Sequence, residues 1–157
     1  MDKPMLEITT IQEKSNVSLS QEVYYFMLMQ VPFGKITRFN DIEEYLAKKY
    51  GVHHIHEFKT TDLIFRNLSN PDSRYIERII AHVPMHREVS AIGYIEHGSE
   101  QVRKLECEGH EIIQKGAKKN NAVKDYKKHL FDFDRETSIS LDTLKKIDKE
   151  GLFDYLL

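Results

Sequence analysis

The side chains best suited to chemistry lie in the stretch 80–89, where Pro84 is followed directly by Met85, His86 and Arg87. Histidine changes its charge near neutrality, so His86 is the first residue to consider for proton handling. Beside it stand a guanidinium that stays protonated and an uncharged thioether. The simpler interpretation is a strand edge that begins at a proline and carries two solvated basic residues. Short motifs often occur by chance, so the elements around this stretch must decide between the two interpretations.

The composition excludes several classes of protein. A chain of 157 residues predicts one domain with room for an appendage. The formal net charge of -2 excludes an overall cationic coat, so any basic DNA-binding surface must be local. A single cysteine, Cys107, excludes an internal disulfide and fits a reducing compartment. No apolar run suits a membrane span or a signal core, so we expect a cytoplasmic protein without a membrane partner.

The first half of the chain predicts a leader followed by helices. Residues 1–17 show no clear period and are expected to form a loose leader that adds at most one short strand. Two helices, over 18–30 and 40–50, each begin at a capping-box pattern and end at proline or glycine. A third helix is expected over 61–68, and a further one after the Asn-Pro pair at 70–71.

The second half predicts a small β-wing and a C-terminal extension. Residues 89–95 alternate around a glycine and predict a two-stranded wing. A helix is expected from Ser99 to Gly116, broken near Gly109. The segment 115–128 holds six lysines and one aspartate, and we interpret it as a solvated helix face or linker ahead of a dedicated phosphate-binding arm. A capped helix from Ser140 and an apolar end that docks complete the chain.

Three histidines, His53, His54 and His56, fall in an expected loop after the second helix. Imidazoles bind metals, yet no paired cysteines or second set of ligands accompany them. Solvent-exposed loop histidines are the better interpretation. We therefore expect neither a metal nor another cofactor.

Three helices with a short turn between the second and third, followed by a β-wing, predict a mainly α fold of the winged helix-turn-helix type. We divide the chain into a leader (1–17), a winged-helix domain (18–114), and a basic segment with a C-terminal helical extension (115–157). In such a fold the third helix enters a groove of DNA. The residues expected to contact phosphates or base edges are Thr37, Arg38, Thr60, Thr61, Arg66 and Asn67. The same layout also serves as a protein-binding scaffold.

Four segments resemble, in the same order, motifs of the O6-alkylguanine-DNA alkyltransferase family. Residues 31–42 (VPFGKITRFNDI) resemble its P-x-G-K-V-T-x-Y-x-D-I opening, and 83–89 (VPMHREV) resemble its active-site motif I-P-C-H-R-V. Residues 90–95 (SAIGYI) are similar to N-S-x-G-x-I, and 103–110 (RKLECEGH) to the L-L-x-x-E-G helix. The resemblance covers about residues 20–113, and the rest of the chain has no counterpart.

The family's mechanism implies that this chain transfers no alkyl group at this position. In the family a cysteine accepts the group as a thiolate, activated through an adjacent histidine and a glutamate; the matching positions are Met85, His86 and Glu108. A thioether has no ionisable proton and cannot become that nucleophile. Cys107 is expected to pack as a small hydrophobe instead. The chain thus resembles the alkyltransferase-like branch, whose members lack the cysteine and bind alkylated guanine without repairing it.

The resemblance implies a remnant base pocket formed by Pro84, Met85, His86, Arg87, Glu108 and Phe39. Phe39 occupies the family's tyrosine position, keeping the ring but losing the hydroxyl. The family's arginine that fills the gap left by a flipped base aligns near Thr61, with Arg66 about one turn later, so no clear arginine finger is present. Base flipping costs a few kcal/mol of unstacking, and each lost contact makes lesion recognition weaker.

We therefore expect a non-catalytic protein that binds double-stranded DNA, including DNA with O6-alkylguanine. The alternative is a winged-helix regulatory or protein-interaction module without lesion recognition, which contacts a protein partner through its C-terminal extension. A third hypothesis is an enzyme that uses His86 and Glu108 as an acid–base pair. It lacks a serine or cysteine next to His86 to act as nucleophile.

Overall fold

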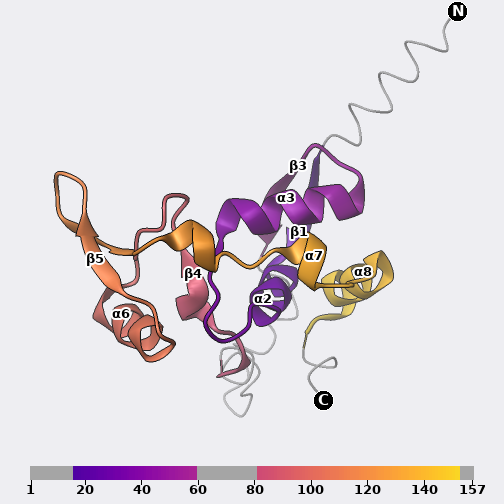
Figure 1. The fold of residues 1–157 in the computed structure, drawn as a ribbon. Coiled ribbons are helices and arrows are strands. Elements are labelled where there is room, and N and C mark those ends of the chain that lie inside the picture. The colour runs from indigo at the N-terminus through magenta and orange to yellow at the C-terminus, as the bar shows by residue number, and fades with distance from the viewer. Residues whose placement is uncertain (1–15, 60–80, 153–157) are drawn as a thin grey trace, which may run out of the picture.

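The computed structural model describes residues 16–59 and 81–152, which form a helix-rich fold with small sheets (Figure 1). The elements of the first range are β1 (Asn16–Ser20), α2 (Gln21–Met29), β2 (Thr37–Arg38), α3 (Phe39–Tyr50) and β3 (His54–Lys59). Those of the second range are η1 (Met85–Arg87), β4 (Glu88–Val89), α6 (Gly98–Cys107), β5 (Ile112–Lys115), β6 (Asn120–Val123), η2 (Tyr126–His129), α7 (Phe133–Glu136) and α8 (Leu141–Glu150). No helix in these two ranges is both long and apolar enough to cross a bilayer.

The described strands pair into three two-stranded sheets. β1 pairs with β3 in parallel, with a register shift after Val17, and β5 pairs with β6 as an antiparallel hairpin. β2 pairs with β4 in parallel, so that Thr37 lies opposite Glu88 and Arg38 opposite Val89. This short pairing brings the connector before α3 beside the segment that follows His86 and Arg87.

The larger hydrophobic core surrounds α2. Met27 and Leu28 of α2 are fully buried, and Leu46 of α3 and Leu144 of α8 are buried in the same cluster. Two carboxylates connect α8 and Leu152 with the start of α2 and the end of β1. The backbone N–H of Leu152 donates to Glu22 Oε1 at 3.0 Å, and the N–H of Ser20 donates to Asp148 Oδ1 at 2.6 Å. The C-terminal helix is therefore part of the core that α2 organises.

A second, smaller core joins the remaining elements. It consists of Ile36, Val89 of β4, Leu105 of α6 and Val123 of β6, all of them buried. The backbone of Ile36 adds two hydrogen bonds, from its N–H to His129 O and from Phe131 N–H to its carbonyl, each 2.9 Å. Residues 114 and 115, between which a domain boundary is expected, both belong to β5, which pairs with β6. The division into domains stays a prediction.

Some helix ends and starts follow the local sequence signals and others do not. The prediction that the second helix ends at Gly51 is confirmed, with φ of +67° at the glycine, and Ser140 caps α8 by accepting a bond from Thr143 N–H. The start predicted at 18 is wrong, since α2 begins at Gln21, and the start predicted at 40 differs by one residue. Residues 18–20 belong to β1 because they pair with β3, and α3 already begins at Phe39.

The structure differs from the loop expected at 52–57 and from the wing expected at 89–95. The histidine segment 52–57 is not a loop: β3 includes His54 and His56 as exposed residues around buried Ile55, which holds the strand on the core. The predicted wing over 89–95 is also wrong. β4 pairs with β2 instead, and Tyr94 forms an antiparallel bridge to Ala122.

The helix predicted from 99 to 116 ends early. α6 stops at Cys107, and Gly109 adopts φ of +94°, which turns the chain. Residues 112–115 then form β5 because their partners in β6 bury one side of the hairpin. The lysine-rich segment 115–128 is consequently neither a helix face nor a linker. It consists of the end of β5, the hairpin turn, β6 and the start of η2.

The helices predicted over 61–68 and after residue 71, and nearly all of the predicted leader, lie outside the described residues. The winged helix-turn-helix arrangement therefore stays a prediction, because its third helix is the element that would enter DNA. The two preceding helices are present as α2 and α3.

Replacing Gly93 with alanine should destabilise the fold by about 2–4 kcal/mol. Gly93 has φ of +83°, and a Cβ there would lie 2.6 Å from the ring of Tyr126, so both backbone strain and a clash oppose the change. Gly98→Ala is the control, since Gly98 has a similar φ of +81° and open space around it. Denaturant unfolding of both variants measures the difference. Equal destabilisation by the two would contradict close packing between Gly93 and Tyr126.

Candidate functional site

The site is built around the carboxylate of Glu108, which follows the last residue of α6. Its Oε1 accepts hydrogen bonds from the backbone N–H of Gly34 at 2.9 Å and from Arg87 Nε at 3.0 Å. Its Oε2 lies 3.1 Å from the same Arg87 nitrogen and is hydrogen-bonded to His86 Nε2. Since the Glu108 side chain is only 6% exposed, these contacts replace its water. One carboxylate thus joins three segments that are distant in the sequence.

Local structure places His86 and Arg87 for these contacts. Pro84 precedes the single turn η1, in which Arg87 N–H donates to Pro84 O at 3.0 Å, so the two basic side chains leave the backbone in quick succession. The guanidinium of Arg87 also donates from Nη1 to Val31 O at 2.7 Å. Arg87 therefore binds both the Glu108 carboxylate and the backbone of Val31, two residues after the end of α2.

The electrostatics of Glu108 favour its charged form. Burial by itself raises the pKa of a carboxyl group, but hydrogen bonds from Arg87, His86 and the backbone of Gly34 outweigh it and lower the pKa of Glu108 to about 2. The carboxylate therefore stays ionised near neutrality, opposite a guanidinium that is always charged. This arrangement orients the imidazole of His86 by a fixed hydrogen bond to its Nε2.

Gln101 on α6 is a positioning residue that the sequence analysis missed. Its side chain is 3% exposed, and its Nε2 donates to His86 O at 3.0 Å and to Glu88 O at 2.6 Å. Its amide oxygen accepts a bond from His97 N–H at 3.0 Å. Gln101 lies one turn before buried Leu105, and only the tertiary structure distinguishes this inward-facing glutamine from a solvated one.

A second group of side chains surrounds Phe39, at the first position of α3. Its ring centroid lies 5.4 Å from that of Tyr24 and 5.7 Å from that of Phe58, yet 41% of Phe39 stays exposed. The hydroxyl of Tyr24 donates to Glu88 Oε2. Burial and this bond raise the pKa of Tyr24, so the phenol remains a donor. The rings of Tyr24 and Phe58 thus pack against Phe39 and leave part of it exposed.

A cavity of about 430 Å³ lies beside Phe39. The described residues that line it are Phe39, Asn40, Glu88, Val89, Ser90, Ala91, Glu96 and His97. Of the six residues predicted to form the base pocket, Phe39 is among them, whereas the other five, Pro84 to Arg87 and Glu108, are not. The structure thus brings His86, Arg87 and Glu108 together in one cluster, with Phe39 at a neighbouring cavity.

Met85 and Cys107 are both exposed. Met85 is 39% exposed at the start of η1. Cys107, at the end of α6, is exposed as well, so the prediction that it packs as a small hydrophobe is wrong. Its position on the outer side of the short helix, opposite buried Leu105, explains the difference.

The residues predicted to bind DNA are only partly described. Thr37 is fully buried, so its side chain does not reach the surface. Arg38 donates to Asp41 through Nε and Nη2 at 2.7 and 2.9 Å and to Ala91 O through Nη1 at 3.0 Å. The hydrogen bond to Asp41 is the main cause that raises the pKa of Arg38. The others, Thr60, Thr61, Arg66 and Asn67, lie outside the described residues.

Across residues 16–59 and 81–152, no group of three or more His, Cys, Asp or Glu side chains is arranged to hold a metal ion. His54 and His56 stand on the exposed side of β3.

Comparisons with known proteins find little similarity. No protein-family model matches this chain, and no curated protein matches it. Two crystal structures are similar at 20% identity: S. pombe Atl1 in complex with damaged DNA containing O6-carboxymethylguanine, and S. pombe ATL in complex with DNA. In both, the similarity covers 71% of this chain and 92% of the other, with TM-scores of 0.42 and 0.43. At this level of similarity neither structure establishes the fold or the function of this chain.

Acid should remove the stabilisation that the Glu108 carboxylate provides. Because its pKa is lowered from 4.5 to about 2 in the folded state, this contribution is complete above pH 4.5 and disappears as the pH falls through about 2. We expect Glu108→Gln to be less stable than the parent near neutrality, by about 2–3 kcal/mol, with the difference shrinking across this window. Denaturant unfolding between neutral pH and pH 2 measures it. A difference that does not change with pH would contradict an ionised Glu108 in this cluster.

Proposed function

We propose that this chain is a non-catalytic DNA-binding protein similar to the alkyltransferase-like proteins, and that it senses O6-alkylguanine in double-stranded DNA. The winged helix-turn-helix is part of this proposal. Its DNA-contacting helix would be the segment 61–68, and the lesion would be received near Phe39, Met85 and the cluster of His86, Arg87 and Glu108.

The observation that carries the proposal is the convergence of all four family-like segments on one place. Glu108, from the fourth segment, binds Gly34 of the first and Arg87 of the second. Arg38 of the first segment donates to Ala91 O of the third. Motifs that matched by chance would have no reason to meet through buried charges and backbone bonds. Their meeting supports the interpretation that the segments form a single site, as the resemblance implies.

The chemistry of this cluster supports binding rather than transfer. The residue that precedes His86 is a thioether, which cannot be deprotonated by the imidazole. His86 Nε2 is engaged by Glu108, and Arg87 is engaged by Glu108 and Val31 O. These contacts fix the positions of the His86 and Arg87 side chains and of the Glu108 carboxylate. Among the described residues that these hydrogen bonds join, none carries a thiol or hydroxyl nucleophile.

The cavity beside Phe39 supports the binding of a base. Its volume of about 430 Å³ is within the range of small-ligand sites, and Phe39, which is 41% exposed, is an aromatic residue on which a base could stack. The rings of Tyr24 and Phe58 pack against Phe39 and hold it in place, which lowers the entropy that stacking would cost.

One observation favours the second candidate, a regulatory or protein-interaction module without lesion recognition. Thr37 is buried and Arg38 is engaged by Asp41 and Ala91, so these two predicted DNA contacts are already occupied within the chain. The absence of binding to a duplex at low salt, where phosphate contacts are strongest, would favour this candidate over the first.

A duplex with one O6-methylguanine should bind more tightly than the same duplex with guanine. Fluorescence anisotropy of the paired duplexes at physiological salt measures the ratio. Phe39→Leu should reduce the lesion preference by roughly tenfold, the scale of stacking one base on an aromatic ring. Phe33→Leu is the matched control, because Phe33 is 68% exposed and does not line the cavity. Equal affinity of the parent protein for both duplexes would refute lesion sensing.

Restoring a thiol at position 85 should restore alkyl transfer. In Met85→Cys, the new thiolate beside His86 would attack the methyl carbon, the C–O bond would break, and guanine would leave and take up a proton. The experiment uses a Cys107→Ser background, because Cys107 is an exposed thiol. Mass spectrometry after incubation with the O6-methylguanine duplex detects a methyl group on the protein. The Cys107→Ser protein with Met85 retained should stay unmodified.

A further inference from the structure

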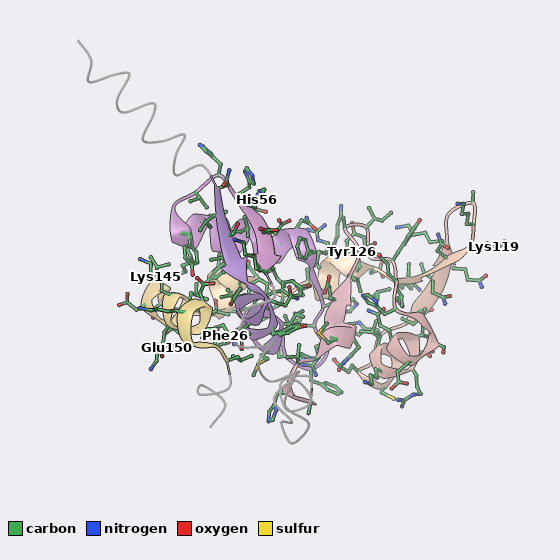
Figure 2. The ribbon with its side chains drawn as sticks, turned by 180° about the vertical axis from the view of Figure 1, so that it is seen from behind. Phe26, His56, Lys119, Tyr126, Lys145 and Glu150 are labelled. Carbon is green, nitrogen blue, oxygen red and sulfur yellow. The ribbon has the colours of Figure 1, made fainter. Side chains whose placement is uncertain are left out.

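The lysines of residues 112–129 lie on the antiparallel hairpin of β5 and β6, which projects from the molecule in Figure 1, and on η2, which follows it; we call these elements together the lysine hairpin. The turn between β5 and β6 bears Lys118 and Lys119, and Figure 2 shows Lys119 at one end of the molecule and Tyr126 of η2 nearer its middle. The segment 115–128 carries a formal charge of +5, while the whole chain carries -2, so the remainder carries -7. A local basic surface on an acidic protein fits a polyanionic partner.

Four of these lysines are not paired with a carboxylate among the described residues. Lys115, Lys118, Lys119 and Lys128 are exposed, and none of them forms an ion pair in the part of the chain that the structure describes. Lys124 differs, because its Nζ lies 3.4 Å from Glu111. Lys127 differs as well. It lines a cavity together with carboxylates from α3 and the start of α7, namely Asp41, Glu44, Asp132 and Asp134.

The hairpin is held rigidly to the body of the protein. Ile95 N–H donates to Asn121 O at 2.9 Å, and Val123 N–H donates to Gly93 O at 3.0 Å. The ring of Tyr126 packs so closely on Gly93 that no side chain fits there. A flexible tail loses entropy when its charges are ordered on a ligand, whereas an anchored hairpin has already lost most of it.

The lysine hairpin also lies near Arg38, one of the residues predicted to bind DNA. The guanidinium carbon of Arg38 lies 5.9 Å from the centroid of the Tyr126 ring, and Lys115 Nζ lies 5.8 Å from the same centroid. Both cations thus share one aromatic ring. Because the guanidinium of Arg38 is paired with Asp41, the cation near this ring that has no carboxylate partner among the described residues is Lys115.

We infer that the lysine hairpin contacts the phosphate backbone of duplex DNA, with Lys115, Lys118, Lys119 and Lys128 as the contacting residues. This inference rests on the proposed function, because it assumes that the chain binds DNA. The contact is independent of sequence and of the lesion, since lysine ammonium groups reach phosphates rather than base edges. Its role is to supply affinity that Thr37 and Arg38, which are occupied within the chain, do not supply.

The salt dependence of DNA binding tests this contact. Each phosphate contact contributes about 0.9 to the slope of log K against log salt concentration. Replacing both Lys118 and Lys119 with glutamine should therefore make this negative slope shallower by up to about 1.8. The same change should weaken binding at low salt by roughly tenfold or more. Lys115→Gln with Lys128→Gln should have a further effect of the same sign.

The matched control removes the same charge elsewhere. Lys145 and Lys146 are exposed on α8, and Figure 2 shows Lys145 and Lys119 at opposite ends of the molecule. The double change of Lys145 and Lys146 to glutamine should leave the slope unchanged. Thermal unfolding of both double variants should match that of the parent protein, because none of the four side chains is buried.

The outcomes separate this inference from the proposed function. A hairpin variant with the parent's slope and affinity, or an equal loss in the α8 control, overturns the hairpin contact while DNA binding stands. A lowered slope in a protein without O6-methylguanine preference supports the hairpin contact and refutes lesion sensing. A hairpin variant that keeps the parent's lesion preference and loses slope supports both. No binding of the parent to duplex DNA at low salt overturns the hairpin contact and DNA binding together.

Discussion

The carboxylate of Glu108 joins three segments of the described structure that are distant in the sequence. It satisfies Arg87, His86 and the backbone of Gly34 at one buried point. Removing one member of such a cluster leaves a desolvated charge without its partner, which costs more than the pair contributes when intact. The carboxylate therefore acts as a constraint on position. If Glu108 is lost, the connection after α2, the turn η1 and the end of α6 lose one of the interactions that hold them together, beside those of Gln101 and of Arg87 with Val31 O.

The two hydrophobic cores position the elements that carry Glu108 and its partners. The larger core around α2 fixes the elements on one side, and the smaller core of Ile36, Val89, Leu105 and Val123 fixes those on the other. Glu108 and Gln101 connect the elements at their border, because Gln101 holds the backbone of η1 and β4 from α6. Side chains placed by rigid elements keep their geometry without a ligand, which is what a preorganised site requires.

Long-range pairing caused most of the errors in the sequence-based expectations. The helix starts expected at residues 18 and 40 rested on capping patterns, but residues 18–20 gain more from pairing with β3. The segment 112–115 continues an apolar helical pattern, yet it pairs with β6 and forms a hairpin. Propensities are weak preferences that burial and pairing override. The sequence showed the positive charge of the segment 115–128 but not its pairing. The segment was therefore expected to be a helix face or a linker, whereas part of it forms the β5–β6 hairpin.

The sequence by itself determined the features that depend on one residue or on its neighbours. The absence of an ionisable group at Met85, the turn at Gly51 and the cap at Ser140 follow from side-chain chemistry and local backbone preference. Only the tertiary structure decided that His86 and Arg87 share Glu108 and that Gln101 faces inward. It also decided that Phe39 borders a cavity without the η1 residues. These features depend on which distant segments bury each other, and no local pattern encodes that choice.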